Sequence, residues 1–346
     1  MDHRPTVPPL TAPTDRLTVR PLLPGGALPL LVTPADGDGA GGRVADWRDW
    51  LPDIHAIVRS HLSEVGGLLF RGLGLHGDAP FRAFAESFGR ALLDYDFGST
   101  PRSAVDKGVY TSTEYPAHQS IPLHNEQAYT LQWPGLIWFH CVTAAASGGA
   151  TPIADSRAVY QSIDPAIRDR FAAKGLMYVR NYGNGLDLPW QRAFNTDDPA
   201  EVERFCRANA IAWEWTEDGE LRTRQICPAV ARHPGSGAMV WFNQAHLFHV
   251  SNLPPAVRDS LMAVVEDEHA LPRHVFYGDG TPIEDTALDH IRAVLDACTR
   301  RFLWEEGDVM MLDNMLAAHG RDPFSGARKV VVAMADPIRS PALPVV

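Results

Sequence analysis

The chain has 346 residues, of which 45% are hydrophobic and 21% charged, and its net charge is −11. This composition is typical of a globular protein. The acidic balance and the lack of any basic run disfavour nucleic acid and anionic membrane surfaces as partners. No apolar run reaches the roughly 20 residues that a membrane span needs. The sequence gives no indication of the oligomeric state.

The four cysteines lie far apart and form no CxxC pair, which argues against a zinc ribbon, a redox motif or a disulfide framework. We expect them to be reduced and mostly buried, in a cytoplasmic protein. The N-terminus is rich in Pro and Thr and lacks the basic flank and apolar stretch of a secretion signal. We therefore predict a loosely held arm over residues 1–45, followed by a single domain over residues 46–346.

The first predicted elements follow the arm. Residues 47–65 carry apolar residues at roughly helical spacing and predict a surface helix. GGLLFRG, a short apolar run between glycines, predicts a buried strand. PFRAFAESFG then predicts a helix that ends at Gly89. Residues 121–144 are rich in aromatic and β-branched residues, and WPGLIWFHCV indicates a strand interrupted by a Pro-Gly turn.

The middle of the chain, at about residues 155–300, is predicted to be a mostly helical insertion. It begins after SGGATPIADS, where Asp155 or Ser156 can act as an N-cap. Val257 and Leu261 belong to one predicted apolar helix face, and TALDHIRAVLDACTRRF forms another. DVMMLDN and KVVVAMAD then return to β character. Because no Walker-type loop is present and the strands do not alternate regularly with helices, we expect an α+β fold with a β core and not a nucleotide-binding doubly wound sheet.

LHNEQAY places His124 and Glu126 one residue apart. If this segment is a strand, both side chains point the same way, because side chains alternate between the two faces. An imidazole and a carboxylate on one face supply two of the three ligands of a 2-His-1-carboxylate Fe(II) site. The alternative is a half-exposed strand with ordinary polar residues on its wet face.

A second histidine must complete such a site. His140 lies in an apolar strand and is expected to be a core histidine with a backbone partner. His246 and His249 are possible ligands at helical or turn spacing. His319 follows an apolar strand and stands shortly before Arg328, whose guanidinium can bind a carboxylate with two hydrogen bonds. A metal and an arginine could together hold a small dicarboxylate, although Arg328 could also be a surface residue.

These motifs resemble the taurine dioxygenase-like branch of the Fe(II)/2-oxoglutarate-dependent oxygenases. The similar segments are GGLLFRG with FRAFAESFG, LHNE, GGATPIADS and MLDNMLAAHGRDPFSGARKVVVAMAD. They extend from about residue 60 to 337 and are weakest between 183 and 225. Within the family, the sequence is most similar to the amino-acid hydroxylases of nonribosomal peptide pathways, of the syringomycin-pathway hydroxylase type.

The resemblance implies a double-stranded β-helix (jelly-roll) core with flanking helices. It implies an Fe(II) site of His124, Glu126 and His319. It implies 2-oxoglutarate and O2 as co-substrates, with Arg328 and Thr151 at the distal carboxylate of 2-oxoglutarate. Arg321 is a candidate helper there, against the alternative of a structural salt bridge.

Two features differ from many relatives. The carboxylate ligand is Glu126 where many have Asp, and the short spacing from His319 to Arg328 requires a tight hairpin. Halogenases of this superfamily lack the carboxylate ligand, so its presence disfavours halogenation. The resemblance instead implies hydroxylation of an unactivated C–H bond, coupled to conversion of 2-oxoglutarate to succinate and CO2.

The implied substrate is an amino acid or an amino-acid derivative in natural-product (antibiotic) biosynthesis. Asn243, Gln244 and His246 are candidate substrate contacts, against an alternative of ordinary packing. The substrate could be free or tethered to a peptidyl carrier protein. Carrier domains are commonly acidic, so the net charge of −11 favours a free substrate.

Other interpretations remain open. The chain could be a non-catalytic binding or regulatory member of the fold, or the same oxidant could give desaturation or cyclisation. A zinc hydrolase or cupin-type isomerase could also use a His/Glu/His set. Such an enzyme would not require Thr151 or Arg328.

Overall fold

Two β-sheets enclose the apolar centre of the protein in the computed structural model, which describes residues 16–35, 46–94, 102–112, 115–182, 188–265 and 267–340. The larger sheet has eight strands, in the order β1 (Leu17–Pro21), β2 (Leu30–Pro34), β3 (Gly67–Phe70), β17 (Val309–Asp313), β7 (Gln132–Thr143), β20 (Lys329–Arg339), β5 (Val109–Thr111) and β4 (Ala104–Asp106). The smaller sheet has four, in the order β16 (Arg300–Phe302), β9 (Thr151–Asp155), β18 (Ala317–Arg321) and β6 (Ile121–His124). A short ribbon pairs β19 (Phe324–Ser325) with β8 (Ser147–Gly148).

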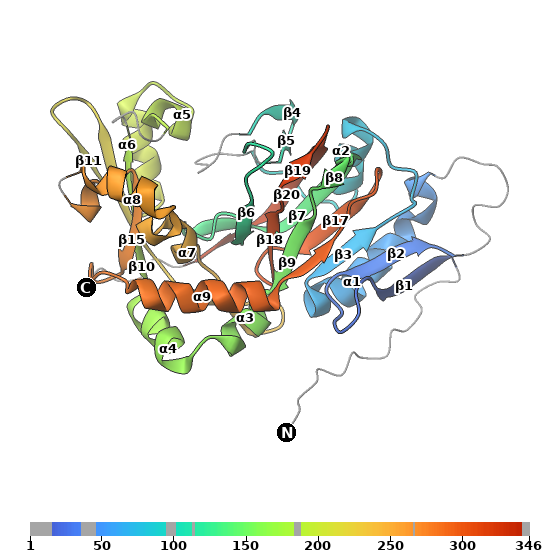
Figure 1. The fold of residues 1–346 in the computed structure, drawn as a ribbon. Coiled ribbons are helices and arrows are strands. Elements are labelled where there is room, and N and C mark those ends of the chain that lie inside the picture. The colour runs from blue at the N-terminus through green and yellow to red at the C-terminus, as the bar shows by residue number, and fades with distance from the viewer. Residues whose placement is uncertain are drawn as a thin grey trace.

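The two sheets pack face to face through apolar side chains. Ile137 and Phe139 of the larger sheet share one buried cluster with Ile153 and Phe302 of the smaller sheet. The other face of the larger sheet is covered by the 3-10 helix η1 (Trp47–Trp50) and the helices α1 (Leu51–Val65) and α2 (Asp78–Glu86). Strand β7 is therefore buried on both faces, which explains its nearly continuous apolar sequence. This arrangement confirms the predicted double-stranded β-helix core (Figure 1).

The prediction of a loosely held N-terminal arm is wrong for residues 17–34. Strand β2 pairs in parallel with β3, and β1 pairs with β2 at the edge of the larger sheet. Leu30 and Val32 are fully buried against the helix-covered face. The short apolar run LPLLV was missed because prolines and glycines surround it. Residues 1–15 and 36–45 of the predicted arm lie outside the described residues.

The middle of the chain forms an inserted unit (residues 156–299) that contains a sheet as well as helices (Figure 1). Its sheet has the order β11 (Ala212–Trp215), β12 (Leu221–Cys227), β10 (Leu176–Tyr182) and β15 (Arg273–Tyr277), and β13 (Val230–Arg232) pairs with β14 (Met239–Trp241). Its helices are α3 (Ser156–Ser162), α4 (Pro165–Lys174), α5 (Trp190–Phe194), α6 (Pro199–Ala208), α7 (Ala245–Phe248), α8 (Pro255–Met262) and α9 (Asp285–Cys298), with 3-10 turns η2 (Val250–Asn252) and η3 (Glu268–Ala270).

The expectation of a mostly helical insertion therefore needs correction. Strand β12 buries every second residue and exposes arginines between them, a strand pattern that the arginines hide in a hydropathy profile. The predicted helix with Val257 and Leu261 is observed as α8, but none of its residues is buried. Helix α9 is confirmed, with Leu288, Ile291 and Leu295 in the core.

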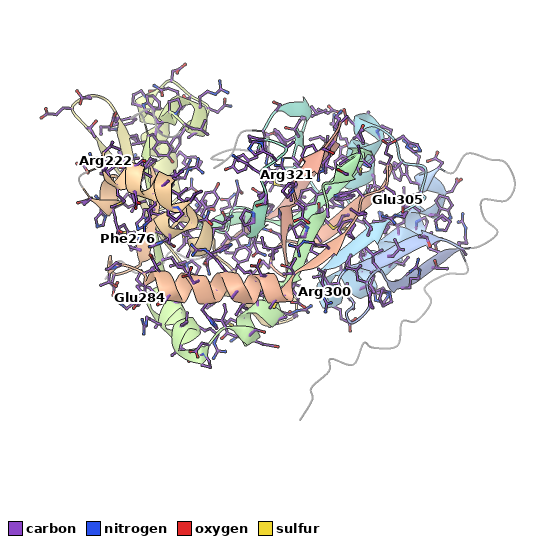
Figure 2. The ribbon with its side chains drawn as sticks, in the orientation of Figure 1. Arg222, Phe276, Glu284, Arg300, Glu305 and Arg321 are labelled. Atoms are coloured by element: carbon purple, nitrogen blue, oxygen red, sulfur yellow. The ribbon has the colours of Figure 1, made fainter. Side chains whose placement is uncertain are left out.

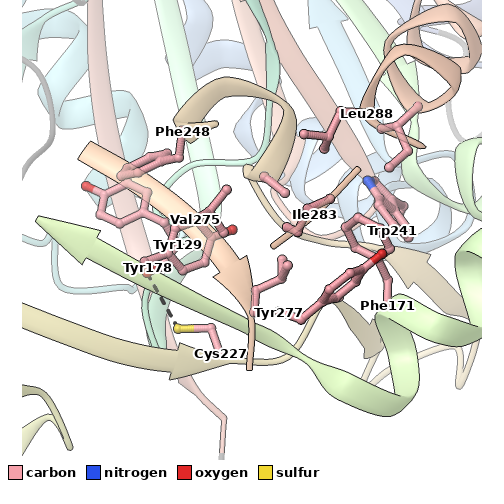
Figure 3. Packing of buried hydrophobic residues seen from close by; sticks show 14 of the residues in the cluster. Tyr129, Phe171, Tyr178, Cys227, Trp241, Phe248, Val275, Tyr277, Ile283 and Leu288 are labelled. Carbon is pink, nitrogen blue, oxygen red and sulfur yellow. Dashed lines mark hydrogen bonds between the residues drawn. The ribbon is translucent and has the colours of Figure 1, made fainter. Parts of the chain in front are cut away.

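Aromatic packing joins the inserted unit to the segment that follows Glu126. The ring of Phe248 lies 5.1 Å from that of Tyr129 and 5.1 Å from that of Tyr178, measured between centroids. Cys227 Sγ also donates a hydrogen bond to the carbonyl of Tyr129 (Figure 3). The insertion thus supports one side of the segment that carries the predicted ligands.

Three of the four cysteines, Cys141, Cys206 and Cys227, are buried, and all four are free thiols. Burial raises the pKa of the Cys141 and Cys206 thiols to about 12. Among the described helices, none combines the length and apolar character needed to cross a membrane.

A buried ion pair connects β3 to the start of β17. Arg71 Nε and Nη2 donate to Asp308 at 2.9 and 2.7 Å, and the Asp308 side chain is 1% exposed. We expect Arg71→Ala to lower the free energy of unfolding by about 3–5 kcal/mol, because it leaves a buried carboxylate without its cation. Urea unfolding followed by circular dichroism measures this loss. Glu305, the other partner of Arg71, is 63% exposed, so Glu305→Gln should cost less than about 1 kcal/mol; equal losses would contradict the prediction.

Candidate active site

Two histidines face each other across a strand pair of the smaller sheet. Strands β6 and β18 run antiparallel with His319 directly opposite His124, and the ring centroids are 4.6 Å apart. The strands approach closely beside this pair, since a Cβ on Gly320 would lie 2.5 Å from the carbonyl oxygen of Ile121. A larger residue at position 320 would therefore push the two histidines apart.

Glu126 reaches the histidine pair from a turn and not from a strand. Strand β6 ends at His124, and Gln127 adopts a left-handed conformation with φ 55°. The condition of the sequence argument, that one strand carries both residues, is therefore not met. The side chains still converge, since one ligand atom from each of His124, Glu126 and His319 lies within 4.8 Å of the others. Two imidazoles and a carboxylate at this spacing fit the donor set of a non-haem Fe(II) ion.

The backbone of Glu126 is held from a distant part of the chain by Asn314, which is fully buried. Asn314 Oδ1 accepts from the amide of Glu126 at 2.8 Å, and Asn314 Nδ2 donates to the carbonyl of Glu126 at 3.0 Å. In return, Asn125 Nδ2 donates to the Asn314 carbonyl at 2.6 Å. Asn314 was not among the predicted site residues, although it lies in the MLDN segment just before β18.

Both histidine side chains are suited to bind a metal ion as neutral imidazoles. Burial lowers the pKa of His124 and lowers that of His319 well below its usual value. His124 Nδ1 lies 2.9 Å from the carbonyl of Pro122, to which it donates its hydrogen. The other ring nitrogen of His124 then carries the lone pair, as a metal ligand requires.

An open pocket adjoins the two histidines, with about 410 Å³ of space not filled by atoms, part of it continuous with solvent. Its lining includes three arginines, Arg102, Arg321 and Arg328, together with Thr151 and Phe139. The ring of Phe139 lies 5.0 Å from that of His319, measured between centroids, and supplies an apolar wall. The concentration of positive charge makes this cavity suitable for an anion.

Arg328 immediately precedes β20 and enters the cavity beside Gly149. Arg328 Nε donates to the Gly149 carbonyl at 3.3 Å, and a Cβ on Gly149 would lie 3.1 Å from the Arg328 side chain. Burial lowers the pKa of Arg328 to about 10, so it remains charged at neutral pH. Among the described residues, no carboxylate lies within ion-pair distance of Arg328, which suits it to an incoming carboxylate.

Thr151, the first residue of β9, lies in the same cavity with a constrained hydroxyl. Trp304 Nε1 donates to Thr151 Oγ1 at 2.8 Å. Because the oxygen already accepts this bond, the hydroxyl hydrogen is available to an acceptor in the cavity. Trp304 is thus a supporting residue that the sequence analysis missed.

Arg321 also lines the cavity, in the part of the molecule formed by the two main sheets (Figure 2). Its guanidinium donates to the carbonyls of Tyr115, Pro116 and Gln119 at 3.0, 2.8 and 2.8 Å. These contacts differ from the structural salt bridge that was the alternative interpretation. They hold the chain before β6 against the cavity.

Asn243, Gln244 and His246 lie behind the ligand segment and do not line this cavity. Gln244 Nε2 donates to the carbonyl of Asn125 at 2.8 Å, and His246 Nε2 donates to that of Leu123 at 2.8 Å. Asn243 Nδ2 donates to the Ala229 carbonyl at 2.7 Å. All three are buried, and the contacts of Gln244 and His246 hold the backbone on either side of His124.

Two other histidines have structural partners. His140 is confirmed as a core histidine, fully buried with Nδ1 3.0 Å from the carbonyl of Asp308. His249 Nδ1 lies 2.8 Å from the hydroxyl of Ser251. Within the described chain, the group formed by His124, Glu126 and His319 is the one cluster with metal-binding geometry.

Comparison with known proteins agrees with this geometry. The family model described as taurine catabolism dioxygenase TauD, TfdA family matches residues 20–334. The chain is 43% identical over 320 residues to the dapdiamide synthesis protein DdaC of Enterobacter agglomerans, which covers 92% of this chain and 94% of that protein. It is 32% identical over 290 residues to a clavaminate synthase-like protein of Arabidopsis thaliana, covering 80% and 83%.

Solved structures share the fold at low sequence identity. PvcB, described as an Fe, alpha-ketoglutarate dependent oxygenase from an isonitrile synthetic pathway, aligns with a TM-score of 0.51 at 18% identity, covering 96% of this chain and 97% of PvcB. AAD-2, solved with Mn(II) and N-oxalylglycine, aligns with a TM-score of 0.51 at 14% identity, covering 95% and 100%.

Proposed function

The chain belongs to the TauD, TfdA family of dioxygenases, and we propose that it hydroxylates an unactivated C–H bond of an amino acid or an amino-acid derivative. It is an Fe(II)- and 2-oxoglutarate-dependent dioxygenase with O2 as co-substrate. One observation carries the assignment of its site. The donor atoms of His124, Glu126 and His319 lie within 4.8 Å of one another, beside a cavity that contains Arg328 and Thr151.

In this proposal, His124, Glu126 and His319 would hold Fe(II). Arg328 and the Thr151 hydroxyl bind the distal carboxylate of 2-oxoglutarate. Bound Fe(II) and 2-oxoglutarate supply the oxidising chemistry, in which O2 converts 2-oxoglutarate to succinate and CO2 and the second oxygen atom enters the substrate. Phe139 excludes water from the side of His319, and Arg321 holds the segment before β6 against the cavity.

Similarity to a dapdiamide synthesis protein supports a role in natural-product biosynthesis. The substrate can be free or tethered to a peptidyl carrier protein, and the net charge of −11 favours the free form. Desaturation or cyclisation is the alternative outcome of the same oxidation. A non-catalytic role is disfavoured because all three candidate ligands are present and converge. We place the enzyme in the cytoplasm on the basis of its four free thiols.

Succinate release in air tests the proposal directly. Iron-loaded enzyme is given 2-oxoglutarate with a panel of free amino acids, and separately with carrier-loaded aminoacyl substrates. We expect stimulation by a member of one panel, and mass spectrometry of the product distinguishes a gain of one oxygen from a loss of two hydrogens. Stimulation by carrier-loaded substrates alone would assign the enzyme to an assembly line. If neither panel stimulates succinate release, the assignment of an amino-acid substrate is contradicted.

A further inference from the structure

A buried arginine contacts the carboxylate of Glu126. Arg102 Nη2 lies 2.6 Å from Glu126 Oε2, and the two side chains are only 3% and 5% exposed. Arg102 precedes β4, 24 residues before Glu126 in the sequence, and lines the same cavity as His124 and His319. A short, charge-assisted hydrogen bond between two buried groups strongly restricts both side chains.

We propose that Arg102 is a positioning residue that keeps Glu126 a one-oxygen metal ligand. This inference rests on the proposed function. Glutamate has one more rotatable bond than aspartate, so its carboxylate needs an additional restraint. Asn314 holds the backbone of Glu126 through two hydrogen bonds, but it does not touch the carboxylate. Arg102 supplies the missing restraint at the other end of the side chain.

The position of the hydrogen bond has a consequence for coordination. Oε2 is engaged by Arg102, so Oε1 is the oxygen left for a metal ion. Three protein donors and the two donors of 2-oxoglutarate leave one position of an octahedral ion for O2. A carboxylate that bound through both oxygens would occupy that position. Arg102 therefore preserves the open position by occupying the second oxygen.

Nitric oxide, which binds Fe(II) at the position that O2 needs, provides the test. Wild-type and Arg102→Met proteins are loaded with Fe(II) and 2-oxoglutarate without O2 and titrated with nitric oxide, with binding followed by electron paramagnetic resonance. We expect Arg102→Met to weaken nitric oxide binding by about tenfold or more, the usual size of an outer-shell effect. Arg102→Lys, which can still donate to Oε2, should restore part of the affinity.

A double-mutant comparison separates positioning from a general structural role. In a Glu126→Asp background, Arg102→Met should leave nitric oxide binding unchanged, because the shorter carboxylate can still bind iron but no longer reaches Arg102. Arg82→Met is the matched control, since Arg82 pairs with Glu86 and Asp106 and does not line the cavity. Should Arg102→Met not fold, Arg102→Gln carries the same test, because glutamine is too short to reach Oε2.

Two results would overturn the inference. One is unchanged nitric oxide affinity in a folded Arg102→Met protein, and the other is an equal loss in the Glu126→Asp background. Failure of the proposed function looks different. In that case the wild-type protein itself would not develop the visible charge-transfer absorption of Fe(II) with 2-oxoglutarate.

Discussion

Replacing His319 with alanine is expected to abolish both the visible absorption of the Fe(II)–2-oxoglutarate complex and the formation of succinate. His319 lies directly opposite His124 in the strand register and is only 4% exposed. Within the described residues, no other imidazole joins the cluster and could replace it. Loss of a direct ligand should lower the Fe(II) affinity by more than the roughly 10- to 100-fold that an outer-shell partner contributes. Glu126→Ala should weaken or abolish the same absorption.

The measurement is an anaerobic titration of apo-protein with Fe(II) at saturating 2-oxoglutarate. His319→Gln serves as a second variant if His319→Ala does not fold. His290→Ala is the matched control, because His290 lies on α9 and accepts a hydrogen bond from the amide of Asp164 at 3.0 Å. This control should retain the full absorption. Full absorption after loss of His319 would remove that residue from the metal site.

The spacing of apolar residues within short stretches of the sequence correctly predicted several helices and strands. The helix of residues 51–65 and the buried strand at residues 67–70 follow from apolar spacing and flanking glycines, and both are observed. Helix α9 was predicted for the same reason, because its apolar residues recur at helical spacing. By contrast, β1 and β2 become part of the core only through pairing with a strand that lies much later in the chain.

The site was predicted in part by resemblance, and its geometry could not be derived from local pattern. The pairing that places His319 opposite His124 joins segments nearly two hundred residues apart in the printed sequence, so no window of sequence contains it. The residues that hold Glu126 were missed for the same reason. Arg102 and Asn314 are single polar residues with no periodicity, and only the tertiary structure brings them to the carboxylate and to its backbone.

Arg328→Ala is expected to raise the 2-oxoglutarate concentration needed for half-maximal absorption by roughly 30- to 1,000-fold. This range corresponds to about 2–4 kcal/mol, the usual cost of removing one partner of a buried charge pair. Arg328 suits this role because the described residues offer it no carboxylate partner of their own. Thr151→Val should have a smaller effect, about 0.5–1.5 kcal/mol, because it removes a single neutral hydroxyl donor.

A comparison of the 2-oxoglutarate concentrations that the variants need tests more sharply how the distal carboxylate is bound. Arg328→Lys should recover part of the affinity, since lysine keeps the charge but loses the planar fork. Arg300→Ala is the control, because Arg300 is exposed and lies outside the cavity lining. The same 2-oxoglutarate titration is applied to Arg328→Ala, Arg328→Lys, Thr151→Val and Arg300→Ala. An unchanged 2-oxoglutarate requirement in Arg328→Ala would remove Arg328 from the binding site of the distal carboxylate.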